Sequence, residues 1–424
     1  MNEEFESVEY KFSPGQVVIG GQMMFVAFGA LVLVPILTGL DPSVALLTAG
    51  VGTLIFQVCT KGQVPVFLAS SFAFIAPIIY GVKTWGIPAT MSGLAAAGVL
   101  YIIISFIVRI KGSSFLEKFL PAVVVGPVIM VIGMILAPVA ITMALGKTGD
   151  GAAVLVPQGY AITLAVIALI TTIAVSLKGS GFLRVVPILS GLIVGYLAAL
   201  IIGAAAGINI IDFSGVAKAP IFALPNFVAP EWNWAAVAFI VPVAIAPAIE
   251  HFGDVLAIRS VTGKDYLKNP GIQNTMLGDG LATTFAGLVG GPPNTTYSEV
   301  TGAVALTRAF NPAIMTWAAI WAIVLSFVGT VGAIVQTIPT PVMGGILILL
   351  FGAITVIGLS SLLRLGDQLM KPRNLIIVSM ILVVGIGGMV LPLGGNAQIG
   401  GIGLAGILGV ILNLIIPDNA AEDT

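Results

Sequence analysis

Long apolar runs separated by short polar stretches extend over most of the chain. Each run has about 20 residues, the length of helix that crosses the hydrocarbon core of a bilayer. The pattern predicts fourteen membrane-spanning helices, at residues 16–38, 42–59, 64–82, 87–109, 122–145, 160–177, 183–206, 234–254, 275–290, 292–310, 312–337, 341–363, 374–393 and 400–416. The expected fold class is therefore an all-α polytopic membrane protein.

The connection after the seventh run is longer and more polar than the others and contains three prolines. It divides the chain into an N-terminal segment, a first seven-span repeat, a connecting segment, a second seven-span repeat and a C-terminal tail, at residues 1–15, 16–206, 207–233, 234–416 and 417–424. Because seven is odd, two copies of a seven-span unit enter the membrane in opposite directions. The pattern thus predicts a 7+7 inverted repeat.

The third run of each half is interrupted by prolines and hydroxyl residues. β-Favouring stretches at Val66–Phe74 and Thr295–Val300 are expected to run extended before a short helix. Interrupted segments at corresponding positions of two repeats are a sequence sign of a transporter's central binding site. The alternative remains open that these prolines and glycines only reflect their general frequency in membrane helices.

Composition supports the membrane assignment and limits the function classes. Of the 424 residues, 58% are hydrophobic and 8% are charged, whereas about a quarter of a soluble domain is charged. The net charge of −1 and the lack of a basic cluster give no indication of nucleic-acid binding. The single cysteine, Cys59, excludes an internal disulfide, and one histidine without an HExxH pattern gives little support for a metal site or an intramembrane enzyme.

The distribution of basic residues predicts the orientation. With a cytoplasmic N-terminus, only Lys83, Lys147 and Lys218 of the 17 lysines and arginines fall on the far side, as the positive-inside rule requires. Both termini are then expected on the cytoplasmic side, and the protein is expected in the cytoplasmic (inner) membrane. Four glutamates precede Lys11, unlike the basic start of a signal peptide, so the first apolar run is expected to be a retained helix.

Four carboxylates interrupt the apolar runs between residues 248 and 302: Glu250, Asp254, Asp279 and Glu299. An acidic side chain at bilayer depth costs several kcal/mol, so these residues predict a substrate site with coupling acids. No lysine or arginine falls within the predicted spans at depth, which favours a neutral or cationic ligand rich in N–H donors over an inorganic anion.

Glu250 and Asp254 are four residues apart and share one helix face. Two carboxylates at that spacing do not both ionise easily in a low-dielectric site, which is typical of a proton-coupling device. For Asp254 the alternative is a solvated residue at the helix end, since Arg259 and a loop follow. His251 points about 100° away from Glu250, and a packing role is expected for it. Asp279 lies between two glycines, where it would support the site through hydrogen bonds.

Several sequence motifs resemble the nucleobase–ascorbate transporter family (nucleobase:cation symporter-2), and within it the bacterial uracil permeases. The motifs are QMMFVAFGALVLVP, KGQVPVFLASSFAFIAP, AIEHFGD, GPPNTTYSEVTG and IPTPVMGGILILLFG. The resemblance implies a core domain of spans 1–4 and 8–11, a gate domain of spans 5–7 and 12–14, short strands in spans 3 and 10, and a homodimer. It also implies proton-coupled import of uracil or a related pyrimidine, without a cofactor and with sodium as an open alternative to protons.

The resemblance also assigns roles to residues. Glu250 and Glu299 would bind opposite edges of the base, and the rest of the substrate set is Phe72, Ala73, Tyr297 and Ser298. The coupling acids would be Glu250, Asp254 and Glu299, and the supporting residues Gln22, His251, Asp279 and Asn294. Three positions depart from the uracil permease pattern: Met23 and Asp254 stand where histidines are usual, and Ser298 where glycine is usual. Asp279 matches an acid of purine members, so a xanthine-type permease is an alternative; an anion exchanger of the same 7+7 fold would require a cationic site.

Overall fold

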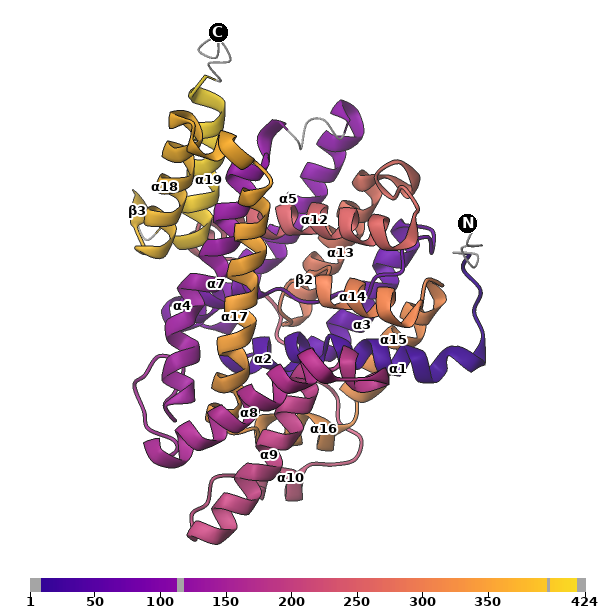
Figure 1. Ribbon diagram of the computed structural model, residues 1–424, viewed down its shortest axis with the longest axis vertical. Coiled ribbons are helices and arrows are strands. Elements are labelled where there is room, and N and C mark those ends of the chain that lie inside the picture. Colours follow the sequence, from indigo (N-terminus) through magenta and orange to yellow (C-terminus); the bar gives the residue numbers. More distant parts are fainter. Residues whose placement is uncertain (1–8, 113–117, 395–396, 418–424) are drawn as a thin grey trace.

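The computed structural model describes residues 9–112, 118–394 and 397–417, and it is predominantly helical (Figure 1). The first half contains α1 (Val17–Val26), α2 (Phe28–Thr38), α3 (Pro42–Cys59), α4 (Ile75–Trp85), α5 (Ile87–Lys111), α7 (Ala122–Ala144), α8 (Gln158–Lys178) and α9 (Pro187–Ala206). The connecting segment contains α10 (Ser214–Lys218). The second half contains α11 (Trp234–Ile240), α12 (Ile245–Thr262), α13 (Ile272–Val289), α14 (Ser298–Thr307), α15 (Ala313–Ser326), α16 (Gly329–Gln336), α17 (Thr340–Leu363), α18 (Pro372–Ile386) and α19 (Gly401–Ile415).

Every predicted span contains at least one helix, which confirms the all-α class. By length and composition, seven helices of the described chain can cross a membrane: α3, α5, α7, α8, α9, α17 and the continuous segment Trp234–Thr262. The pair α1 and α2, bent by 40° at a short break, makes an eighth. The chain is therefore a multi-pass membrane protein, and the count of fourteen crossings stays a prediction.

The bounds of four predicted segments were wrong. The helix predicted to end at residue 254 continues to Thr262 through Arg259, which had suggested the start of a loop, and Asp254 is buried. The segment 312–337 divides into α15 and α16, and the segment 374–393 leaves the helix at Ile386, where Gly387 and Gly388 follow. Residues 298–300, expected to be extended, form the first turn of α14.

Two short antiparallel sheets complete the described structure. β1 (Ala69–Ser70) pairs with β2 (Asn294–Thr295), with Ala69 opposite Thr295. β3 (Val390–Gly394) pairs with β4 (Ala397–Gly400) as a hairpin between α18 and α19. Each strand of the first pair has two residues and lies in the third segment of its half, where a short strand was predicted; the pairing of the two strands was not predicted.

The packing of the first half is repeated in the second. α5 packs on α13 as α15 packs on α3, α8 packs on α9 as α18 packs on α19, and α17 packs on α8 as α18 packs on α7. α7 packs on its own counterpart α17, and β1 pairs with its counterpart β2. A two-fold axis that passes between two equivalent strands at right angles to them makes them antiparallel, as these are. The fold is therefore a 7+7 inverted repeat.

The strongest packing separates two groups of helices. One contains α7, α8, α9, α17, α18 and α19, and the other contains α1, α3, α5, α13 and α15. Glycines allow close approach inside the first group: a Cβ at Gly344 of α17 would lie 2.2 Å from the backbone nitrogen of Ala144. The assignment of such groups to a mobile core and gate stays a prediction.

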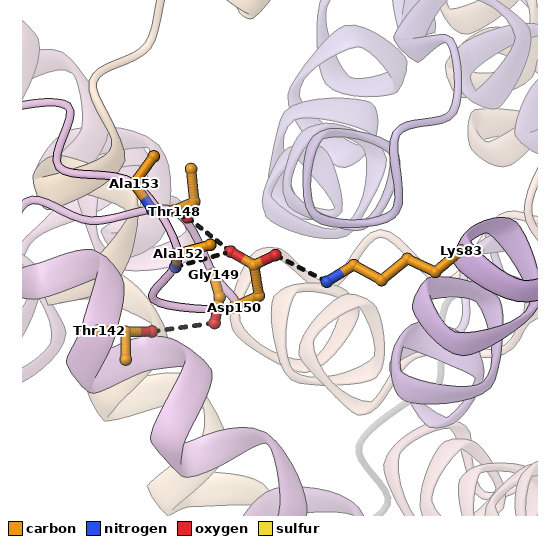
Figure 2. Close-up of polar contacts among 7 residues, drawn as sticks. All are labelled: Lys83, Thr142, Thr148, Gly149, Asp150, Ala152 and Ala153. Carbon is orange, nitrogen blue, oxygen red and sulfur yellow. Dashed lines mark hydrogen bonds and ion pairs between the residues drawn. The ribbon is translucent and has the colours of Figure 1, made fainter.

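An exposed ion pair links α4 to the loop between α7 and α8 (Figure 2). Lys83, in the last turn of α4, contacts Asp150 of the α7–α8 loop, with 2.7 Å between Nζ and Oδ2. The other carboxylate oxygen accepts hydrogen bonds from Thr148 Oγ1 at 2.6 Å and from the backbone N–H of Ala152 at 3.1 Å. Hydrogen bonds from Lys83, Thr148 and Ala152 lower the pKa of Asp150 below its usual value, with Lys83 contributing most.

Candidate functional site

Two interrupted segments cross near the middle of the molecule and expose backbone groups there. The Ser71 N–H donates to the carbonyl of Pro293 (2.8 Å), beside the β1–β2 pair. Neighbouring helices hold the extended backbone: Leu68 N–H donates to Thr53 Oγ1 (2.9 Å), and Thr283 Oγ1 donates to the Asn294 carbonyl (2.9 Å). Such non-helical backbone at depth requires this kind of satisfaction by the surrounding protein.

A cavity of about 520 Å³ lies beside these segments. Its walls come from α7, α12 and α17, from the start of α14 with Tyr297 before it, and from Phe72, two residues after β1. Six of the predicted site residues line it: Phe72, Glu250, Asp254, Tyr297, Ser298 and Glu299. The tertiary structure thus brings predicted residues from three distant parts of the chain to one cavity.

Glu250 and Glu299 present carboxylates to the cavity without strong ties to the protein. Glu250 is half-buried, and it makes no hydrogen bond to another residue of the described chain. Glu299 is in the first turn of α14, where the helix dipole favours a negative charge. Both carboxylates are therefore available to accept N–H groups of a ligand.

Asp254 is held differently. It is 4% exposed, which rules out the alternative of a solvated residue at a helix end. Its carboxylate accepts hydrogen bonds from Thr296 Oγ1 (2.8 Å) and Ser298 Oγ (2.5 Å). α12 is thereby joined to the start of α14.

Aromatic side chains close one side of the cavity. The Phe72 ring meets Tyr297 edge-on, with 5.8 Å between the ring centroids, and meets Phe351 of α17 in the same way at 6.4 Å. The Tyr297 hydroxyl donates to the Ser70 carbonyl. These contacts place the aromatic rings of Phe72 and Tyr297 in the cavity wall next to the carboxylates, where they could contact a planar ring.

The predicted supporting residues lie behind the cavity wall. His251 and Asp279 are completely buried, with 3.1 Å between Nδ1 and Oδ2, and His251 Nε2 is 2.9 Å from Thr275 Oγ1. Asn294 Nδ2 donates to the Thr48 carbonyl at 2.9 Å. Ala73 is buried, and neither it nor Gln22 on α1 is among the lining residues.

Part of the lining was not predicted. On α17 and at its C-cap it comprises Ile354, Ile357, Ser360, Ser361 and Arg364, and on α12 it includes Gly253 and Ser260. The α17 residues recur at intervals of three to four, so a helix-face analysis could have found them as one stripe. From Glu250 to Ser260 the α12 wall is about 15 Å long, at 1.5 Å per residue. Among the described residues that line the cavity, Arg364 is the one basic side chain.

Comparison with known proteins identifies the family. A family model described as "Permease family" (Xan_ur_permease) matches residues 14–394. The chain is 54% identical over 402 residues to "Probable uracil permease" of Haemophilus influenzae, covering 95% of this chain and 94% of that protein. It is 43% identical over 436 residues to "Uracil permease" of Bacillus caldolyticus, covering 100% and 98%.

Solved structures agree on the fold. The transmembrane domain of the cyanobacterial bicarbonate transporter BicA matches with a TM-score of 0.66 at 15% identity, covering 96% of this chain and all of that one. Murine Slc26a9, an anion transporter solved in the inward-facing state, matches with a TM-score of 0.64 at 12% identity, covering 96% and 69%. At these identities the likeness concerns the fold alone. From its sequence relatives, with the broken segments and the cavity between them, the chain belongs to the permease family.

Proposed function

We propose that this protein imports uracil or a closely related pyrimidine nucleobase across the cytoplasmic membrane, coupled to protons. Relatives that are 38–54% identical over nearly the whole chain are named uracil permeases. The observation that carries the proposal is that Glu250 and Glu299 line one cavity beside the Phe72 and Tyr297 rings.

A pyrimidine base fits the chemistry of this cavity. Its ring N–H groups would donate to the carboxylates of Glu250 and Glu299, one on each edge of the base. The Phe72 and Tyr297 rings would cover a face of the base, and Ser298 would add a hydroxyl contact. A charge-assisted hydrogen bond is stronger than a neutral one, so the two glutamates would carry most of the recognition.

Proton coupling would use the carboxylates of the same cavity, with Glu250, Asp254 and Glu299 as the candidate acids. A proton on an acidic side chain removes the cost of carrying its charge through the membrane interior. Transport would follow alternating access, in which the group of α7, α8, α9, α17, α18 and α19 moves against the remainder. Sodium is the alternative coupling ion. The transmembrane ion gradient would supply the energy for transport, so no cofactor is proposed. We also propose cytoplasmic termini and a homodimer.

Two other ligands fit less well. A xanthine-type purine was suggested by Asp279, but Asp279 pairs with His251 behind the cavity wall. An inorganic anion would need a cationic site, and among the described residues that line the cavity Arg364 is the one basic side chain, against the three carboxylates of Glu250, Asp254 and Glu299. The sequence relatives favour a pyrimidine over both.

Uptake of radiolabelled uracil into proteoliposomes tests the proposal. We expect accumulation under an inward proton gradient, little under a sodium gradient, and loss of accumulation in Glu250→Gln. Glu231→Gln, in the connecting segment, is the matched control and should transport like the parent. Uptake of xanthine with no uptake of uracil, or accumulation by Glu250→Gln at the parental level, would contradict the proposal.

A further inference from the structure

Both oxygens of the Asp254 carboxylate are engaged by one short turn. Thr296 Oγ1 donates to Oδ2 at 2.8 Å, and Ser298 Oγ donates to Oδ1 at 2.5 Å. Thr296 and Asp254 are both nearly inaccessible, at 1% and 4% exposure. The Asp254 side chain therefore forms a clamp with Thr296, which is buried, and with Ser298, which is exposed, between α12 and the start of α14.

The clamp residues lie next to Tyr297 and Glu299, two of the residues proposed to contact the ligand. Thr296 and Ser298 flank Tyr297, whose hydroxyl donates to Ser70 and whose ring contacts Phe72. Glu299 follows directly in the first turn of α14. Holding the turn on both sides of Tyr297 fixes the position of its ring and the direction in which Glu299 projects.

Glu250, one helical turn before Asp254, has the opposite arrangement. It lines the cavity and makes no hydrogen bond to another residue of the described chain. A proton or a ligand N–H can therefore exchange at Glu250 without breaking a protein contact. At Asp254 the same exchange would force a hydroxyl to turn from donor to acceptor and would loosen the clamp.

Other charged groups lie in the same region, but none of those described donates a hydrogen bond to Asp254. On α12, His251 contacts Asp279 of α13. Glu299 of α14 and Arg364, the residue after α17, also line the cavity. Among the residues that the structure describes, only the two hydroxyls donate hydrogen bonds to the Asp254 carboxylate.

We propose that Asp254 is a positioning residue, which holds the Thr296–Ser298 turn against α12 and so orients Tyr297 and Glu299 toward the ligand. Proton exchange on α12 then falls to Glu250 alone. The inference deepens the proposed function and rests on it for the identity of the ligand, whereas the clamp is a property of the ligand-free protein.

A double-mutant cycle on the full chain tests the clamp. We expect Asp254→Asn and Ser298→Ala each to weaken uracil binding by about tenfold, the effect of losing one hydrogen bond to a charged group. The double variant should bind no more weakly than Asp254→Asn, because both changes break the same contact. Ser298→Thr keeps the hydroxyl and should restore binding. Losses that multiply to about a hundredfold would overturn the inference.

Transport kinetics separate positioning from proton transfer. Asp254→Asn should raise the KM for uracil while proton-driven accumulation continues, whereas Glu250→Gln should lose accumulation. An Asp254→Asn protein that binds uracil normally but no longer responds to the proton gradient would make Asp254 a proton carrier and overturn the inference.

A measurement without ligand distinguishes failure of the clamp inference from failure of the proposed function. If the parent protein does not bind uracil, the proposed function fails. The clamp is then judged by melting temperatures without ligand, where the shifts of Asp254→Asn and Ser298→Ala should be less than additive. Additive shifts would overturn the clamp whatever the substrate is.

Discussion

Gly253 offers a change that should stabilise the fold and impair binding at the same time. It lies inside α12 between Glu250 and Asp254 and lines the cavity. A Cβ built at this position meets no atom within 4 Å, so Gly253→Ala causes no steric conflict with the protein. Glycine in a helix interior is less favourable than alanine by about 0.8–1.0 kcal/mol. The variant should therefore be more stable than the parent by about 0.5–1 kcal/mol.

The same methyl group projects into the space where a base would contact Glu250. Moving the base away from the carboxylate removes a hydrogen bond to a charged group, so affinity for uracil should fall about tenfold or more. Gly253→Leu should abolish binding.

Melting temperature and uracil affinity, measured on the same purified protein, test this prediction. Gly352→Ala is the matched control, because Gly352 is inside α17, has no atom within 4 Å of its added Cβ and does not line the cavity. It should gain similar stability with unchanged affinity. If Gly253→Ala and Gly253→Leu both keep the parental affinity, the cavity is not where the ligand binds.

Three further predictions concern the scaffold. Gly344→Val should destabilise the protein by about 1–3 kcal/mol in a melting experiment, since its side chain would collide with the α7 backbone at Ala144; an unchanged melting temperature would contradict this packing. Asp41→Ala should cost about 1 kcal/mol, because Asp41 caps α3 by accepting from the Ser43 N–H at 2.7 Å, and Asp41→Asn should retain most of the stability. The pKa of Asp150 is lower in the folded protein than in the unfolded chain, where it is about 3.9. The stability that the charged Asp150 contributes is therefore fully present above about pH 3.9 and is lost as the pH falls through the lower folded value. The difference in melting temperature between Asp150→Asn and the parent should thus be equal at about pH 5 and pH 8.

The sequence predicted those site residues whose chemical type differs from that of their neighbours in the same segment. Glu250, Asp254 and Glu299 are carboxylates in apolar surroundings, and the structure places all three on one cavity. Phe351 and Arg364 carried no such signal. Phe351 is one apolar residue among many, and Arg364 was assigned to a loop, although α17 brings both to the site.

The hydrophobic pattern by itself determined the membrane class, the positions of the helices and the two interrupted segments, because transfer of a segment into lipid depends on its own composition. Only the tertiary structure decided which polar groups meet. Asp254 binds hydroxyls more than 40 residues further along the chain, and His251 pairs with Asp279 on the helix that follows. Such contacts form only when the distance between packed helices is correct to a few tenths of an ångström. The spacing of residues along the sequence contains no information about that distance.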